Sequence, residues 1–151
     1  MKNISRVIFA SGSGTTRAPM ATAIFRATPH AEEYTCEARG LIVQFPEPLN
    51  QKVDAVLISN GIELKDYSTK KLMDSDFTEN TLVITMEETQ RQKILTEYSN
   101  ATEENTQLLN ELVGDELEVI DPYGGSIQTY GLCYEVLKVS IEKLIKILEA
   151  Q

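Results

Sequence analysis

Short apolar runs alternate with amphipathic stretches along the chain, which predicts strands that alternate with helices. Residues 7–10 form a continuous apolar run, typical of a buried strand. After a polar loop at 11–16, apolar residues return at helical spacing, and Pro19 lies where the first turn of a helix tolerates it. We therefore expect a helix that begins near Ala18.

The rest of the chain continues this alternation. In chain order, the pattern predicts a strand around 34–38 closed by Gly40, a helix over 49–59 capped by Gly61, a short helix over 68–73, a strand over 82–86, helices over 88–98 and 105–113, a strand over 117–120 and a long final amphipathic helix. The predicted inward positions are Val53, Val56 and Leu57 in the 49–59 helix, and Ile127, Tyr130, Tyr134, Leu137, Ile141, Leu144, Ile145 and Leu148 in the last.

Strands separated by helices indicate the α/β class, with a parallel sheet covered by helices on both faces. The chain has 151 residues, which is the usual length of one domain. We therefore expect residues 1–151 to form a single domain.

Composition and charge narrow the classes of function. The net charge of −9 argues against a nucleic-acid binder that uses a broad basic face. No apolar run approaches the roughly 18 residues of a membrane span, and the run at 7–10 is too short for a secretory signal. Two cysteines make neither a disulfide framework nor a metal site. We expect a cytoplasmic protein without metal or cofactor, and without nucleic acid or membrane as a partner.

The charges are unevenly distributed. Residues 1–30 hold four basic residues and no acidic one, whereas residues 87–118 hold nine acidic and two basic residues. The basic beginning can offer an anion a favourable field even in an acidic chain. The alternative is that both segments are simply solvated surface.

The polar loop after the first predicted strand is a candidate anion site. In a parallel α/β sheet, ligands bind where a strand ends and a loop leads into a helix. Gly12 and Gly14 would allow positive φ, so that backbone amides point at one anion, and Arg17 could bind two of its oxygens. The candidate phosphate-binding residues are Ser11, Gly12, Ser13, Gly14, Thr15, Thr16, Arg17 and Ala18. The alternative is a flexible turn with a surface arginine.

Three other loop types do not match these residues. A Walker A loop needs a Gly-Lys-Ser/Thr ending, which is missing here. The dinucleotide fingerprint fails at its third glycine, where this chain has Arg17. The serine nucleophile elbow matches at neither Ser11 nor Ser13.

With these residues, the sequence resembles the low-molecular-weight protein tyrosine phosphatases. Their loop reads Cys-x5-Arg-Ser/Thr-Pro-Met, and this chain reads Ser11-x5-Arg17-Ala18-Pro19-Met20. Their second signature is Asp-Pro-Tyr/Phe before the last helix, and this chain has Asp121-Pro122-Tyr123 there.

The resemblance implies a four-stranded parallel sheet of the phosphotyrosine protein phosphatase I-like type. It also implies a two-step reaction through a loop thiolate. Arg17 would clamp phosphate, Asp121 would act as general acid and base, and Tyr123 would line the substrate pocket.

The departures from the family pattern fall at the chemical centre. The nucleophile position holds Ser11, the bracing asparagine is replaced by Gly14, and the hydroxyl residue after the arginine is replaced by Ala18. A laboratory Cys-to-Ser change and natural divergence are both open as the origin of Ser11. Because three supporting positions differ together, we favour divergence.

Ser11 is a poor substitute for a thiolate because a serine hydroxyl needs a base to take its proton. The single histidine, His30, would lie ~20 Å from Arg17 along a helix. Cys36 and Cys133 fall in a predicted strand and helix, where packing is their expected role.

Three hypotheses follow. The first is a pseudophosphatase that binds a phosphate or phosphotyrosine-like anion, with a phosphoprotein as a candidate partner. The second is an active phosphomonoester hydrolase that uses Ser11, or a directly positioned water, with Asp121 as general acid and base. In the third, Asp121-Pro122-Tyr123 persists only as a turn. Arsenate reduction is excluded because residues 81–92 contain no resolving cysteine.

Overall fold

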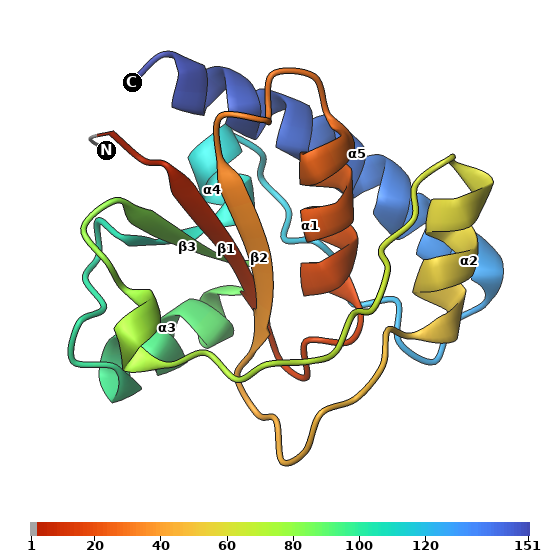
Figure 1. The fold of residues 1–151 in the computed structure, drawn as a ribbon, viewed down its shortest axis with the longest axis horizontal. Coiled ribbons are helices and arrows are strands. Elements are labelled where there is room, and N and C mark those ends of the chain that lie inside the picture. The colour runs from red at the N-terminus through yellow and green to blue at the C-terminus, as the bar shows by residue number, and fades with distance from the viewer. Residues whose placement is uncertain (1–2) are drawn as a thin grey trace.

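Four parallel strands form one sheet in the order β2-β1-β3-β4 (Figure 1). They are β1 (Arg6–Ser11), β2 (Thr35–Gly40), β3 (Thr81–Thr85) and β4 (Thr106–Leu108). This computed structural model describes residues 3–151. The predicted α/β fold with a four-stranded parallel sheet is confirmed.

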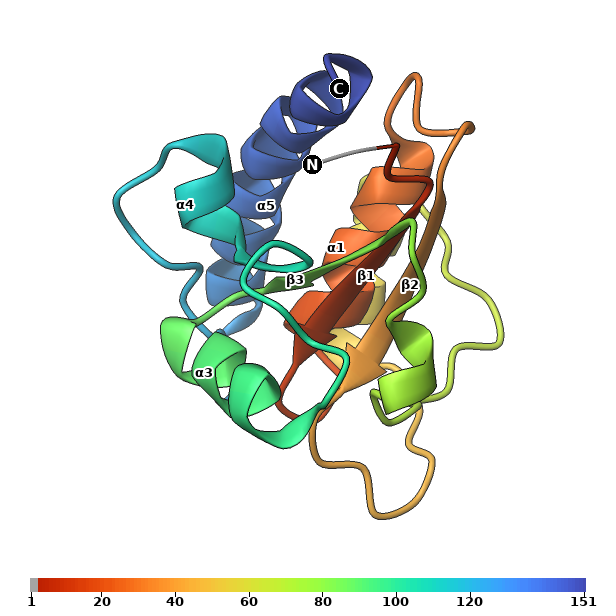
Figure 2. The same cartoon turned by 90° about the vertical axis from the view of Figure 1, so that its left-hand side faces the viewer.

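Helices cover both faces of the sheet. The helices are α1 (Arg17–Ala27), α2 (Gln51–Ser59), α3 (Glu88–Glu97), α4 (Leu109–Val113) and α5 (Ile127–Glu149), with a short 3₁₀ turn, η1 (Asp74–Asp76). Helices α1, α2, α4 and α5 contribute to the core on one face, and α3 packs alone on the other (Figures 1 and 2).

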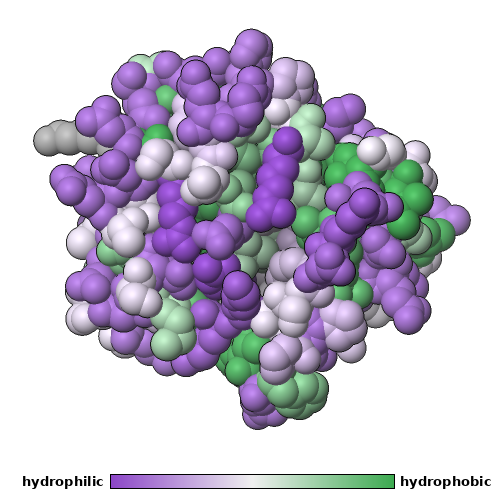
Figure 3. All heavy atoms as spheres, viewed as in Figure 1, coloured by the Kyte–Doolittle hydropathy of each residue, from purple (hydrophilic) through white to green (hydrophobic). Residues whose placement is uncertain are grey.

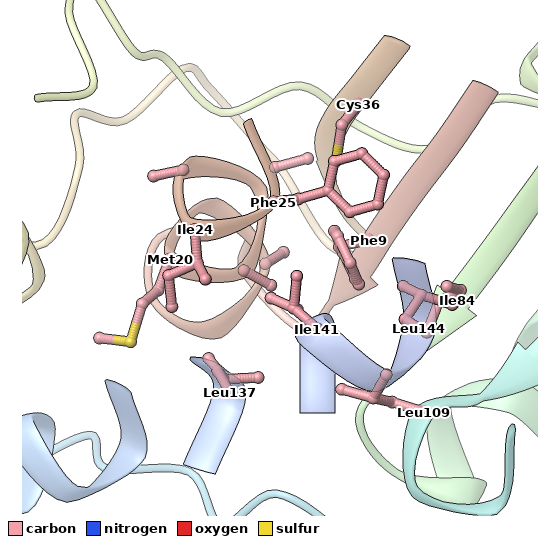
Figure 4. Packing of buried hydrophobic residues seen from close by; sticks show 14 of the residues in the cluster. Phe9, Met20, Ile24, Phe25, Cys36, Ile84, Leu109, Leu137, Ile141 and Leu144 are labelled. Carbon is pink, nitrogen blue, oxygen red and sulfur yellow. The ribbon is translucent and has the colours of Figure 1, made fainter. Parts of the chain in front are cut away.

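The central strand β1 contributes side chains to the hydrophobic cores on both faces of the sheet, because its side chains alternate between the two faces. Val7 and Phe9 belong to the larger core beneath α1 and α5. Ile8 and Ala10 belong to the smaller core beneath α3. Figure 4 shows Phe9 among buried side chains of α1, β3 and α5. Burial on both faces explains the continuous apolar run of this strand.

The predicted 49–59 helix is confirmed as α2, with Val53, Val56 and Leu57 buried. The side chain of Asn50 caps it by accepting hydrogen bonds from two backbone amides. Gly61 follows its end with a φ of 75°, the left-handed conformation expected of a glycine there.

The helix predicted over 68–73 is wrong, and the helix predicted over 105–113 is wrong in part, because in both segments backbone pairing outweighs periodicity. Residues 68–73 are not helical but extended, and they form isolated bridges that include Gly40 with Lys71. The predicted 105–113 helix splits into β4 and α4. The amide of Val83 bonds to the carbonyl of Asn105, so the start of this segment completes the sheet.

The predicted strand at 117–120 is also wrong. The edge beside β3 is already occupied by β4, so this segment has no ladder partner and runs as irregular backbone. Only Val119 in it is buried. The predicted inward face of the last helix is confirmed except at Ile127, which is 43% exposed in the first turn of α5.

A cluster of four charged side chains joins β1, β2 and η1. Arg6 and Arg39 both contact the carboxylate of Asp76, at 3.1 and 3.3 Å, and both also contact Glu37. Burial alone would raise the pKa of Asp76, but the Met73 amide and the two arginines together hold it below its ordinary value.

The face seen in Figure 3 is largely hydrophilic, with apolar side chains gathered over α2 and at the tip of the loop that follows β2. Ile42 and Phe45 of that loop are exposed. Among residues 3–151, no helix is both long enough and apolar enough to cross a bilayer.

Candidate active site

A pocket of about 420 Å³ opens at the carboxyl ends of β1 and β3. These strands are neighbours, but α1 and α3 leave them toward opposite faces, and such a point creates a crevice in an α/β sheet. The pocket is lined by Ser11, Gly12, Ser13, Thr15, Thr16, Arg17, Glu47, Glu87, Gln90, Asp121 and Tyr123. Eight of the ten residues predicted for the site therefore meet here, whereas Gly14 and Ala18 do not line the pocket.

The loop after β1 is held by its carbonyl groups. The amide of Leu41 donates to the carbonyls of Ser11 and Gly12, and the amide of Ile42 also donates to Gly12. In the described chain, the amide of Thr15 donates to the Ser13 hydroxyl, whereas the other six amides of residues 12–18 have no hydrogen-bond acceptor: Gly12, Ser13, Gly14, Thr16, Arg17 and Ala18. A loop whose carbonyls are bonded and whose amides are free is suited to an anion.

Gly14 fixes the turn in this loop. Its φ is 77°, and a Cβ built there would lie 3.0 Å from the amide nitrogen of Gly40. The Tyr67 hydroxyl donates to the Gly14 carbonyl at 2.6 Å. Burial raises the pKa of Tyr67 to about 12, so it remains a donor across the physiological range. The prediction of positive φ at Gly12 is wrong, since Gly12 lies outside the left-handed region.

The beginning of α1 is left open toward the pocket. The N-cap residue Thr16 makes no capping hydrogen bond with its side chain. Its hydroxyl instead contacts that of Thr15 at 3.2 Å, and Thr15 contacts that of Ser13 at 2.8 Å. The free amides of the first turn carry the positive end of the helix dipole.

Arg17 is buried at the pocket wall, with its side chain only 4% exposed. Its guanidinium donates to the carbonyl of Val119 at 2.7 Å and to the carboxylate of Glu87 at 2.5 Å. A carboxylate oxygen of Asp121 lies 3.7 Å away. Because a guanidinium has five N–H groups, three remain free of these two hydrogen bonds.

Asp121 and Tyr123 come from the turn before α5. One oxygen of Asp121 accepts the Tyr123 amide at 3.1 Å, and its other oxygen faces Arg17. The Asp121 side chain is 51% exposed and Tyr123 is 75% exposed, so both stand at the mouth of the pocket. A carboxyl group and an aromatic ring therefore border the entrance of the pocket.

Three polar residues of the pocket were not singled out by the sequence pattern: Glu47, Glu87 and Gln90. Glu87 lies two residues after the end of β3, and β3 lies next to β1. The signal for it is the carboxyl end of the predicted strand at 82–86, because neighbouring parallel strands end at the same edge. Glu47 lies in an irregular loop and has no comparable signal.

The two cysteines and the histidine do not line the pocket. Burial raises the pKa of Cys133 to about 11, although the charge of Arg17 lowers it in part. Cys36 is fully buried in the core, and burial raises its pKa further. His30 lies beyond the far end of α1 from Arg17. Within residues 3–151, no group of three or more His, Cys, Asp or Glu is arranged to hold a metal ion.

The strand-loop-helix unit, with its buried arginine and free amides, defines an α/β protein with a candidate oxyanion site. A model of the family described as low molecular weight phosphotyrosine protein phosphatase matches residues 6–151. The chain belongs to this family.

Three similar proteins illustrate the likeness. PtpB of Staphylococcus haemolyticus (strain JCSC1435), a low molecular weight protein-tyrosine-phosphatase, is 29% identical over 145 residues, which cover 92% of this chain and 96% of PtpB. The crystal structure of a low molecular weight protein tyrosine phosphatase from T. tengcongensis has a TM-score of 0.88 at 29% identity, covering 94% and 98% of the two chains. A YwlE arginine phosphatase mutant, with serine in place of cysteine and a phosphorylated active site serine, has a TM-score of 0.87 at 26% identity, covering 95% of each chain.

Proposed function

We propose that the chain binds a phosphate monoester or phosphate dianion in the loop from Ser11 to Arg17, and that hydrolysis is absent or slow. The observation that carries the proposal is the buried guanidinium of Arg17, with free N–H groups beside a loop of unbonded amides. Amide dipoles and a guanidinium fork match the oxygens of a phosphate.

The slow chemistry follows from Ser11, which we propose stands at the nucleophile position of the family. A serine hydroxyl keeps its proton near neutral pH unless a base accepts it. The acidic side chains that could accept this proton at the pocket are Glu47, Glu87 and Asp121, and a carboxylate is a weak base. The thiol of Cys133 is protonated at this pH because its pKa is about 11.

The alternative is a hydrolase that uses Ser11 or a positioned water. In the first case, Asp121 would accept the proton of the Ser11 hydroxyl as its oxygen attacks phosphorus. The bond to the leaving oxygen would break, and Asp121 would pass that proton to the leaving oxygen. The phosphorylated serine of the YwlE mutant supports the capacity of such a loop to hold phosphoserine. Because an alkoxide leaves far less readily than a thiolate, we expect this reaction to stop after one phosphoryl transfer.

The charges of the pocket bear on which phosphoryl compounds it would bind. Glu47, Glu87 and Asp121 outnumber the single cation Arg17. A ligand that carries a positive charge next to its phosphoryl group offsets this excess better than phosphotyrosine does. The relatives include both tyrosine and arginine phosphatases. Phosphoarginine is therefore a second candidate ligand beside phosphotyrosine.

A comparison of three forms tests the proposal: the chain as given, Ser11→Ala and Ser11→Cys. We expect all three to bind inorganic phosphate, and only Ser11→Cys to release phosphate from an aryl phosphate or from phosphoarginine over many turnovers. Intact-protein mass measurement after incubation reports whether Ser11 retains one phosphoryl group. Sustained turnover by the chain as given that is lost in Ser11→Ala would instead establish the hydrolase.

A further inference from the structure

An apolar groove lies beside the candidate active site, between segment 115–122 and α5. It has a volume of about 580 Å³. Its most exposed apolar side chains are Leu117 at 81%, Ile120 at 80% and Leu132 at 68%. In Figure 2, the segment after α4 swings out from the body of the protein and returns to the start of α5. Adjoining exposed aliphatic side chains of this kind typically mark an interaction surface.

The groove is bordered by acidic groups. Asp115, Glu116 and Glu118 line it, and among the described residues no lysine or arginine does. Lys143 pairs with Asp115 at 2.8 Å, and Glu118 accepts the amide of Glu88. Glu116 forms no ion pair with any residue of the described chain. The border therefore keeps a negative charge that a cationic partner complements.

The same charge disfavours two other occupants. A second copy would bring the same carboxylates together, on a chain whose net charge is already −9. An anionic membrane surface would be repelled in the same way. We propose that the groove binds a polypeptide segment that presents aliphatic side chains flanked by lysine or arginine.

The groove and the anion pocket share one wall. Pro122 lines the groove, whereas its neighbours Asp121 and Tyr123 line the pocket. Val119 also lines the groove, and its carbonyl accepts the hydrogen bond from Arg17 at 2.7 Å. A segment docked in the groove lies beside the mouth of the pocket and contacts the backbone that holds Arg17. The docking itself requires no anion binding, so it stands independently of the proposed function.

Fluorescence anisotropy with model peptides tests the docking surface. The probe is a labelled peptide of leucine and lysine at helical spacing, and the comparison peptides replace leucine by serine or lysine by glutamate. We expect the leucine-lysine peptide to bind and both comparison peptides to bind at least roughly ten-fold more weakly. Leu132→Ser and Glu116→Lys should each weaken binding by about ten-fold.

Matched variants elsewhere control for the loss of an apolar group and for the change of charge. They are Ile58→Ser on α2, where Ile58 is 55% exposed, and Glu104→Lys. Both should bind as the unchanged chain does. Hydrogen exchange of the unchanged chain with bound peptide should show protection at 115–122 and at the start of α5.

Several results would overturn the proposal. They are no binding, equal binding of the serine-lysine peptide, equal weakening by the control variants, or protection at another place. If sedimentation showed a dimer of the unchanged chain and a monomer of Leu132→Ser, the groove would instead bind a second copy of the chain. If the unchanged chain bound anionic vesicles and Leu132→Ser did not, the groove would instead bind a membrane surface.

Discussion

The guanidinium of Arg17 and the carboxylate of Glu87 form an ion pair across the candidate pocket, with 2.5 Å between Nη2 and Oε2. Arg17 is the first residue of α1, which follows β1, and Glu87 follows the neighbouring strand β3. The pair therefore connects the two strand ends between which the crevice opens. Glu87 orients the guanidinium, but it also places a negative charge where a phosphate would bind.

Glu87→Gln should strengthen the binding of inorganic phosphate. Loss of one negative charge beside Arg17 removes repulsion of roughly 1.4 kcal/mol, which corresponds to about ten-fold in affinity. Calorimetric titration measures this change. Glu88→Gln is the matched control, because Glu88 pairs with Arg91 and does not line the pocket. Weaker binding in Glu87→Gln would mean that the orientation of Arg17 matters more than the charge.

Ser11→Cys should introduce a thiol with a pKa well below the ordinary value of roughly 8.5, because free amides and Arg17 stabilise its thiolate. The pH dependence of alkylation measures this pKa. The background is low because Cys36 and Cys133 are buried. Ser13→Cys, at an exposed position of the same loop, should titrate close to the ordinary value. If the two introduced thiols react alike, the loop lacks the expected field.

Gly14→Ala should destabilise the fold, whereas Gly12→Ala should not. At position 14, the φ of 77° and the nearby Gly40 backbone both oppose a side chain, at a cost of about 2 kcal/mol. At position 12, a Cβ would meet no atom within 4 Å. Thermal and urea unfolding compare the two variants. Equal stability of both would show that Gly14 does not fix the turn.

Asp76→Asn should lower stability by roughly 3 kcal/mol at neutral pH, because Arg6 and Arg39 then lose a shared partner. The pKa of Asp76 lies below its ordinary value of 3.8, so its contribution is complete above that value. The contribution is lost as the pH falls through the folded-state pKa.

Urea unfolding from pH 7 to pH 3 should therefore show the gap between Asp76→Asn and the unchanged chain closing toward the acid end. Glu79→Gln, at an exposed position, should give no such gap. A gap that stays constant with pH would rule out the ionised carboxylate as its source.

The sequence predicts the fold well where burial dictates the pattern. The run at 7–10 is apolar throughout because β1 is covered on both faces, and the periodicity of α5 reflects its contact with α1. Prediction from the sequence fails where pairing with a distant strand determines the secondary structure of a segment. Asn105 and Thr106 have no local sequence pattern typical of a strand, but they pair with the edge of β3 and so extend the sheet.

Some residues of the candidate site can likewise be found from the sequence, whereas others depend on the tertiary fold. Ser11 to Arg17 is a local segment, and Asp121-Pro122-Tyr123 has a recognisable turn pattern, so both can be found from the sequence. Glu87 enters the pocket only because β3 lies beside β1, and the sequence does not state the strand order. The link from the Val119 carbonyl to Arg17 spans 102 residues and has no side-chain signature.

The proposed function depends on the joint binding of a tetrahedral oxyanion by Arg17 and the loop amides. Calorimetric titration of inorganic phosphate into the unchanged chain, Arg17→Gln and Lys146→Gln tests it directly, with circular dichroism to verify folding. Lys146→Gln removes one positive charge from the last turn of α5, at the opposite end of that helix from the Asp121 turn. We predict that phosphate binds the unchanged chain and Lys146→Gln equally, and binds Arg17→Gln at least roughly ten-fold more weakly. Equal affinity for a folded Arg17→Gln, or no binding to the unchanged chain, would show that Arg17 and the loop amides do not form a phosphate site.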